Sequence, residues 1–268
     1  MAKFESYLQG TPNWIEHMGP DQSAAKQFYA DLFGWQYDDR AIDDHGSVYT
    51  LATIEGDRVA GLGTDLPEQQ GQPARWNVYL AADDVDAAAA KVAQAGGQVV
   101  AGPFDVPDAG RMAFVQDPGG AIVGLWQAAG TIGSERANEP GTNCWNELSV
   151  SDVDKTATFY QEVLGVQPNT QDMGEMGLYT TFEVDGRSVA GAMPLRAGLS
   201  PNWNVYINVE DTDGTVATAV ELGAELVAPV VDAPTIGRMA FLRDPQGAAF
   251  NVIQNPPEEA AQPSPQQT

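Results

Sequence analysis

The feature that most constrains the fold of this chain is an internal repeat. The stretch from Trp76 to Gln127 aligns without gaps with the stretch from Trp203 to Gln254, and 22 of the 52 aligned positions are identical. The preceding segments, which start at Trp14 and Trp145, also pair along about 23 residues. A repeat of roughly 130 residues must be interpreted before any local pattern. The chain therefore contains two copies of one fold.

Each copy begins with a short apolar strand followed by an amphipathic helix. The first helix has apolar residues spaced at i, i+3, i+4 and i+7, and the helix of the second copy repeats this spacing. Asp21 and Asp152 are N-cap candidates, and Gly34 and Gly165 are positioned to end the two helices. Strands that turn at a glycine follow in both copies. The first half of each copy is therefore predicted to form a strand, a helix and then several strands.

The second half of each copy repeats the same order of elements. In the first copy a strand at Trp76 precedes a helix expected from Asp84 to Ala95, and Gly96 follows it. The unit therefore occurs four times in the chain. We expect a first domain over residues 1–127, a linker over 128–143 and a second domain over 144–254. The proline-rich residues 255–268 are expected to form a disordered tail.

Composition limits the classes of partner. The chain has 13 Lys and Arg residues against 37 Asp and Glu residues, a formal net charge of −24. Such a surface repels nucleic acid and anionic membranes, so we expect neither as a partner. No stretch approaches the ~20 apolar residues of a membrane span, and a cytoplasmic location is expected. Cys144, the single cysteine, is expected to be a small buried residue and not a nucleophile.

Several repeated motifs resemble one protein family. The helix endings "FY…LFGW" and "FY…VLGV", and "DPGGA" and "DPQGA" before the final strands, are similar to those of the vicinal oxygen chelate superfamily. This superfamily includes glyoxalase I, bleomycin resistance proteins and extradiol dioxygenases. The resemblance implies an α+β fold of two tandem domains, each built of two βαβββ units that form a cupped mixed sheet. It does not by itself determine function.

The same resemblance locates the positions of a metal site. Enzymes of this family generally bind a divalent metal through two histidines and a glutamate, which come from the opening strands of the two units and from the final strand. No histidine or carboxylate stands at the six corresponding positions, which are Trp14, Asn77, Gly124, Trp145, Asn204 and Asn251. An indole cannot ligate such a metal and a neutral amide does so poorly. We predict no metal ligand at these positions and no cofactor. Binding of a divalent metal by other residues is not excluded.

The two histidines of the chain lie outside these positions. His17 alternates with the residues expected to face the cup, so its side chain is expected to point toward the helices or solvent. We interpret it as a structural hydrogen-bonding residue. His45 lies in a loop-like stretch and offers no better catalyst. A Ser–His–Asp triad therefore has no support.

The opening strands instead place aromatic and polar residues together. Residues two apart on a strand share a face, and in this family that face lines the cup. Glu16 and Glu147 are the candidate catalytic residues. We expect Arg111 and Arg238, or a tyrosine, as their buried partners; in the alternative both arginines lie on the rim and both glutamates contact water or backbone. The candidate ligand-binding residues are Trp14, Glu16, Asn77, Tyr79, Arg111, Trp145, Glu147, Asn204, Tyr206 and Arg238.

These residues favour three functions to different degrees. Aromatic walls with a few polar groups are typical of a site for a small organic molecule, so metal-independent binding or sequestration of such a ligand is favoured. An enzyme with lyase, isomerase, hydroxylase-like or dioxygenase-like activity is the alternative, with a glutamate as general base or with unidentified metal ligands. An interaction scaffold, whose two domains pair with each other within the chain or with another chain, is the third.

Overall fold

The computed structural model describes residues 3–42, 47–65, 71, 73–174, 177–233 and 235–256. The first copy of the repeat forms a mixed eight-stranded sheet in the order β2-β3-β4-β1-β5-β8-β7-β6. Its strands are β1 (Pro12–Met18), β2 (Gln36–Ala41), β3 (Val48–Ile54), β4 (Asp57–Gly63), β5 (Arg75–Ala81), β6 (Gln98–Val106), β7 (Gly110–Gln116) and β8 (Ile122–Ala128). Helices α1 (Gln22–Phe33) and α2 (Val85–Val92) complete the copy.

The second copy forms its own sheet in the matching order β10-β11-β12-β9-β13-β17-β16-β14, with β15 paired to β16. Its strands are β9 (Asn143–Val150), β10 (Gln167–Asp172), β11 (Leu178–Val184), β12 (Arg187–Pro194), β13 (Asn202–Asn208), β14 (Glu225–Leu226), β15 (Val231–Ala233), β16 (Gly237–Arg243) and β17 (Ala249–Gln254). Helices α3 (Val153–Leu164) and α4 (Thr212–Glu221) follow β9 and β13. The expected α+β fold of two tandem domains with βαβββ units is confirmed.

The helix ends follow the local sequence signals. The side chain of Asp21 accepts a hydrogen bond from the amide of Ala24, and Gly34 ends α1 in the left-handed conformation, φ 74°. Asp152 and Gly165 do the same for α3. The helix expected from Asp84 to Ala95 is shorter, because regular helix ends at Val92 and a turn leads to Gly96. Glycine at that position admits its positive φ of 87°.

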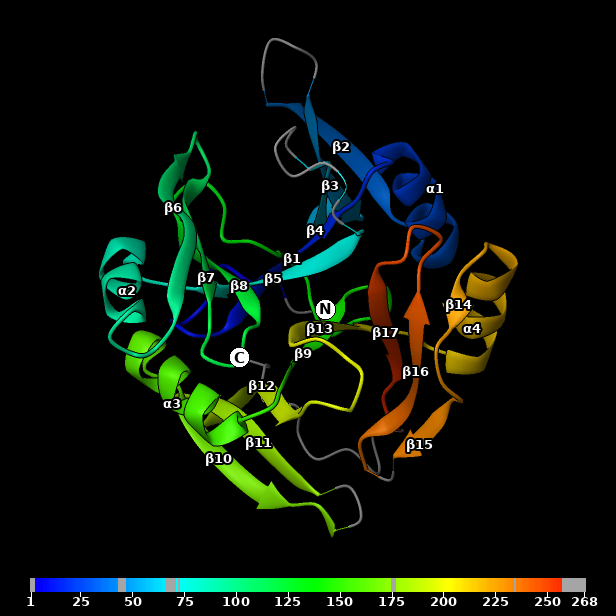
Figure 1. Cartoon of the computed structure of the whole chain (residues 1–268). Coiled ribbons are helices and arrows are strands. Elements are labelled where there is room, and N and C mark those ends of the chain that lie inside the picture. Colours follow the sequence, from blue (N-terminus) through cyan, green and yellow to red (C-terminus); the bar gives the residue numbers. More distant parts are fainter. Residues whose placement is uncertain are drawn as a thin grey trace.

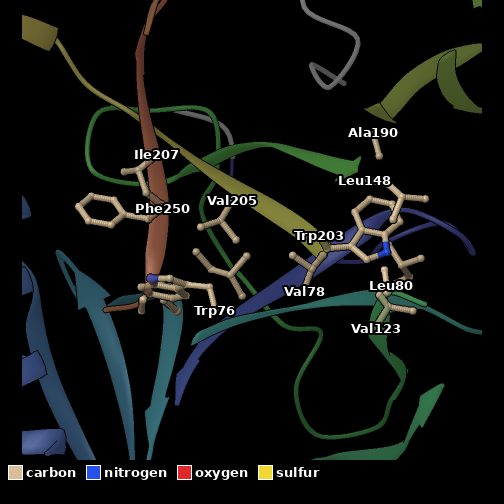
Figure 2. Close-up of a cluster of buried hydrophobic side chains, with 14 of the residues drawn as sticks. Trp76, Val78, Leu80, Val123, Leu148, Ala190, Trp203, Val205, Ile207 and Phe250 are labelled. Carbon is tan, nitrogen blue, oxygen red and sulfur yellow. The ribbon is translucent and has the colours of Figure 1, made fainter. Parts of the chain in front are cut away.

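The two sheets pack back to back (Figure 1). Alternate residues of the central strands β5 and β13 point into the shared core, and helices α1 with α4 and α2 with α3 pack in pairs beside it. Figure 2 shows this core, in which Trp76, Val78 and Leu80 lie with Trp203 and Phe250. All of these side chains are buried. The faces of the sheets opposite to the helices are therefore directed away from one another.

Repeated motifs also connect the two copies through buried hydrogen bonds. Asp244 of the "DPQGA" turn accepts a bond from the Tyr29 hydroxyl at 3.0 Å and lies 2.9 Å from Nε2 of His17, so it joins the second copy to the first. In the reciprocal contact Tyr160 donates to Asp117 at 2.8 Å. Each tyrosine hydroxyl also accepts a bond from an indole, that of Trp76 for Tyr29. These motifs therefore serve the interface between the copies.

The stretch expected to be a linker packs closely on the first sheet. Asn13 donates to the carbonyl of Ile132 at 3.0 Å, and Trp35 donates to the carbonyl of Gly141 at 2.8 Å. Arg136 is buried and forms ion pairs with Glu55 and Asp57. The expected tail lies almost wholly outside the described residues. In the part of the chain that the structure describes, no helix is both long and apolar enough for a membrane span.

Candidate functional site

The central strands of each sheet carry the candidate residues on the face opposite to the helices. In the first sheet β1 and β5 are antiparallel, and Glu16 stands opposite Asn77 while Trp14 stands opposite Tyr79. In the second sheet Glu147 stands opposite Asn204 and Trp145 opposite Tyr206. We call these two curved faces the first and second cup. The first cup comprises Trp14, Glu16, Tyr49, Asn77, Tyr79 and Phe114, and the second Trp145, Glu147, Tyr179, Asn204, Tyr206 and Phe241.

Glu16 lies in the first cup as a buried carboxylate held by neutral donors. The hydroxyl of Tyr79 donates to Oε2 of Glu16 at 2.8 Å, and Nδ2 of Asn77 donates to the same oxygen at 3.1 Å. Glu16 is 8% exposed. A carboxylate removed from water requires such donors. Tyr49 also forms a side-chain hydrogen bond with Glu16.

A second aromatic pair supports this carboxylate. The indole Nε1 of Trp14 donates to the hydroxyl of Tyr49 at 3.0 Å. Tyr49 reaches this position because Gly61 lies beneath its ring, where a Cβ would overlap the phenol oxygen. Burial raises the pKa of Tyr49 well above its usual value, and the charge of Glu16 raises that pKa further. The phenol therefore stays a neutral donor at any physiological pH.

The second cup repeats this arrangement. Tyr179 donates to Oε2 of Glu147 at 3.0 Å, and Tyr206 donates to Oε1 at 3.1 Å. Trp145 in turn donates to the hydroxyl of Tyr179 at 2.9 Å. Burial raises the pKa of Glu147, although the tyrosine hydrogen bonds oppose this effect. The amide of Asn204 differs from that of Asn77, since it donates to the carbonyl oxygen of Glu147 and not to the carboxylate.

Sequence reasoning missed Tyr49 and Tyr179, which complete the two networks. A signal for them exists, because the tyrosine of "YTL" and the tyrosine of "YTT" occupy matching places in the repeat. The glycines beneath them, Gly61 and Gly191, also match. A repeated tyrosine paired with a repeated glycine on the neighbouring strand indicates a ring lying flat against the sheet.

The expected partnership of the cup glutamates with arginine is wrong, and the tyrosine alternative is correct. Arg111 forms ion pairs with Asp86 and Asp105, at 2.7 and 2.8 Å. Arg238 makes the matching contacts with Asp213 and Asp232. Each arginine lies between two exposed aspartates, one in the first turn of a helix and one on a strand, so it gains charged partners without being desolvated. Neither arginine contacts a cup glutamate.

The side chains at the family's metal-ligand positions do not suit a metal. Tyr79 covers Gly124, where a Cβ would overlap its ring, so no longer side chain fits there. Trp14 is engaged with Tyr49. Among the described residues no three His, Cys, Asp or Glu side chains gather as a metal site. A single carboxylate with phenol donors lacks the charge and the donor number that a divalent transition metal requires.

Of the other reactive side chains, His17 and Cys144 are described by the structure and take no part in the cup networks. His17 is buried against Asp244 in the interface between the copies, as its place on the strand indicated. Burial raises the pKa of the Cys144 thiol to about 12, so this thiol stays protonated and is no nucleophile. His45 lies outside the described residues.

Comparison with known proteins identifies the family of both copies. The model of the Glyoxalase/Bleomycin resistance protein/Dioxygenase superfamily matches residues 11–125, and that of the Glyoxalase-like domain matches residues 146–253. The chain belongs to this superfamily. "Putative glyoxylase CFP32" of Mycobacterium tuberculosis is 44% identical over 97% of this chain and all of its own length. The anthracycline biosynthesis protein DauV of Streptomyces sp. is 36% identical over 92% of this chain and 94% of its own.

Solved structures of the superfamily share the fold. The Mn(II)-bound glyoxalase from Novosphingobium aromaticivorans superposes with a TM-score of 0.63 at 18% identity, covering 92% of this chain and 83% of its own. A catechol 2,3-dioxygenase superposes with a TM-score of 0.61 at 14% identity, covering 98% and 92%. At such identities the likeness extends to the fold alone.

Proposed function

We propose that this glyoxalase-like protein binds small, flat organic molecules in its two cups without a metal. The observation that carries the proposal is the buried glutamate of each cup, held by tyrosine hydroxyls and flanked by a tryptophan. A carboxylate in a site shielded from water is a strong acceptor for a hydroxyl or cationic group of a ligand. The surrounding rings offer apolar faces for stacking on an aromatic body.

The hydrogen bonds between the rings support a preorganised site. Trp14 is held by Tyr49 and Tyr79 is held by Glu16, so the rings keep their orientation without a ligand. Tyr79 also lies 5.4 Å from the ring of Phe114, which extends the aromatic surface across the sheet. A wall whose side chains are already fixed loses little conformational entropy on binding.

The names of two relatives favour the same class of ligand. DauV of Streptomyces sp. and DnrV of Streptomyces peucetius are anthracycline biosynthesis proteins, each 36% identical to this chain. Anthracyclines are flat polycyclic aromatic compounds that carry hydroxyl groups, and such compounds match the cups in shape and chemistry. We therefore extend the proposal to hydroxylated polycyclic aromatics as the first compounds to test.

A thermal-shift screen of the wild type, Glu16→Gln and Glu147→Gln in EDTA tests this proposal. Hydroxylated aromatic compounds should stabilise the wild type, and at least one variant should bind a given hit about tenfold more weakly, because a charged acceptor is lost. Glu162→Gln, on the exposed surface of α3, is the matched control and should behave as the wild type. Far-UV circular dichroism verifies that the variants are folded. If a compound raises the melting temperature of all four proteins equally, the glutamates are not part of the binding site.

One observation favours a second candidate function. Burial raises the pKa of Glu147, and a carboxyl group with a raised pKa is suited to proton transfer. In that case the second cup would transform the ligand that it binds, with Glu147 as the acid or base. Mass spectrometry of each hit after incubation separates the two functions, since only an enzyme converts the compound, and Glu147→Gln should abolish the conversion.

A further inference from the structure

The two cups differ in where their positive charges lie. In the first cup Arg75 begins β5, and its guanidinium makes two hydrogen bonds to Asp65, at 2.7 and 3.2 Å. Asn202 occupies the matching place in the second cup. The segment that joins β12 to β13 instead contributes a different arginine, Arg196. The first cup thus has an arginine paired with an aspartate, whereas the second cup has an arginine from a different segment of the chain.

Arg196 lies on the cup side of the second sheet. Its guanidinium carbon is 5.8 Å from the centroid of the Phe241 ring, a cation–π contact. Phe241 stands opposite Asn251, and Asn251 stands beside Tyr206 on the next strand, so these side chains share one face. Tyr206 donates to Glu147. Figure 1 shows the segment between β12 and β13 in yellow.

The guanidinium of Arg196 is unpaired within the part of the chain that the structure describes. Arg75, Arg111 and Arg238 each form an ion pair with an aspartate, but Arg196 forms none. The positive charge of Arg196 does act on Glu147 and Tyr206, whose pKa values it lowers against the larger effect of burial. In a chain of net charge −24, an arginine without a carboxylate partner is available to an external anion.

We propose that the second cup takes a flat aromatic ligand that carries an anionic group, and that Arg196 determines this specificity. This inference rests on the proposed binding function. The aromatic body would lie against Phe241, whose ring is half-buried, and the anion would meet the guanidinium at the edge of the cup. A guanidinium binds carboxylate, sulfonate or phosphate oxygens through directed hydrogen bonds. The first cup, in which Arg75 is neutralised, would not prefer an anion.

Two matched fluorescent probes test the inference. The anionic probe is 8-anilinonaphthalene-1-sulfonate, and N-phenyl-1-naphthylamine is the same aromatic body without the sulfonate. Titrations of the full chain in EDTA should give tighter binding of the sulfonate at one site. Arg196→Gln should weaken that binding about tenfold and change binding of the neutral probe less than about twofold. Arg196→Lys should keep part of the preference, and Lys155→Gln, a control that removes a positive charge from the exposed surface of α3, should keep all of it.

The outcomes separate the inference from the proposed function. If the neutral probe binds but Arg196→Gln leaves the affinity for the sulfonate unchanged, the specificity assigned to Arg196 is wrong. The proposed binding of aromatic molecules in the cups would then still hold. An equal loss of sulfonate binding in Lys155→Gln and Arg196→Gln also overturns the inference, because net charge alone would then explain the effect. If neither probe binds to the wild type, the proposed function fails together with the inference.

Discussion

Replacing Asp244 by alanine is expected to lower the free energy of unfolding by about 3 to 5 kcal/mol. Oδ2 of Asp244 contacts both His17 and Tyr29, and Oδ1 accepts the backbone amides of Gln246 and Ala248 at 2.9 Å. The substitution therefore leaves buried donors of both copies without an acceptor. Thermal unfolding followed by circular dichroism measures the change.

Asp232→Ala is the matched control for this prediction. Asp232 also forms an ion pair, with Arg238, but its side chain is 74% exposed, so its loss should cost less than about 1 kcal/mol. A similar small effect for Asp244→Ala would show that the buried bonds between the copies do not stabilise the protein.

The contribution of Asp244 should also depend on pH. Burial alone would raise the pKa of this carboxyl group, but the hydrogen bond and charge of His17 outweigh it, and the pKa is lowered. A lowered pKa means that the ionised group stabilises the folded state above about pH 4, and that this stabilisation is lost as the pH falls through the folded pKa. The stability difference between the wild type and Asp244→Ala should therefore shrink in acid.

Gly61→Ala and Gly191→Ala are expected to disrupt one cup each. A Cβ at Gly61 would overlap the hydroxyl of Tyr49, and one at Gly191 would overlap the hydroxyl of Tyr179. Because the strand backbone cannot move freely, the ring must leave, and the indole and carboxylate that it contacts lose a partner. We expect a destabilisation of about 2 kcal/mol for each variant. Each variant should also lose one binding site for N-phenyl-1-naphthylamine.

The two variants serve as controls for each other. Gly191→Ala should abolish the preference for the sulfonate probe, whereas Gly61→Ala should retain it, because Arg196 belongs to the second cup alone. Chemical denaturation measures stability, and fluorescence titration measures the number of sites. Retention of both sites in both variants would mean that the probes bind elsewhere on the protein.

Much of the fold follows from local sequence patterns that occur in both copies of the repeat. Asp21 and Gly34 delimit a helix whatever its surroundings, since a side-chain cap and a left-handed glycine are local features. The alternation along β1 likewise separates Glu16 from His17, which face opposite sides of the sheet. Such patterns depend only on neighbours in the chain. They therefore predict the strand and helix order and the face on which each candidate lies.

The partners of these side chains depend on distant segments and could not be predicted in the same way. No sequence pattern indicates the distance in space between Arg111 and Glu16. In the structure Arg111 instead donates to Asp86 at the start of α2. Asp244 bonds to His17, 227 positions away in the chain, only because the two sheets pack back to back. The "DPQGA" motif thus identified the family without revealing that its aspartate holds the two copies together.

Calorimetric titration of the best aromatic compound from the screen, with and without metal, tests the central claim most directly. The protein is first dialysed against EDTA, and the titration is then repeated with added Mn²⁺ or Zn²⁺. We predict binding in EDTA with a dissociation constant that metal changes by less than about twofold, because each cup binds through rings and a glutamate already held by tyrosines. Binding that appears only when metal is added would contradict the account.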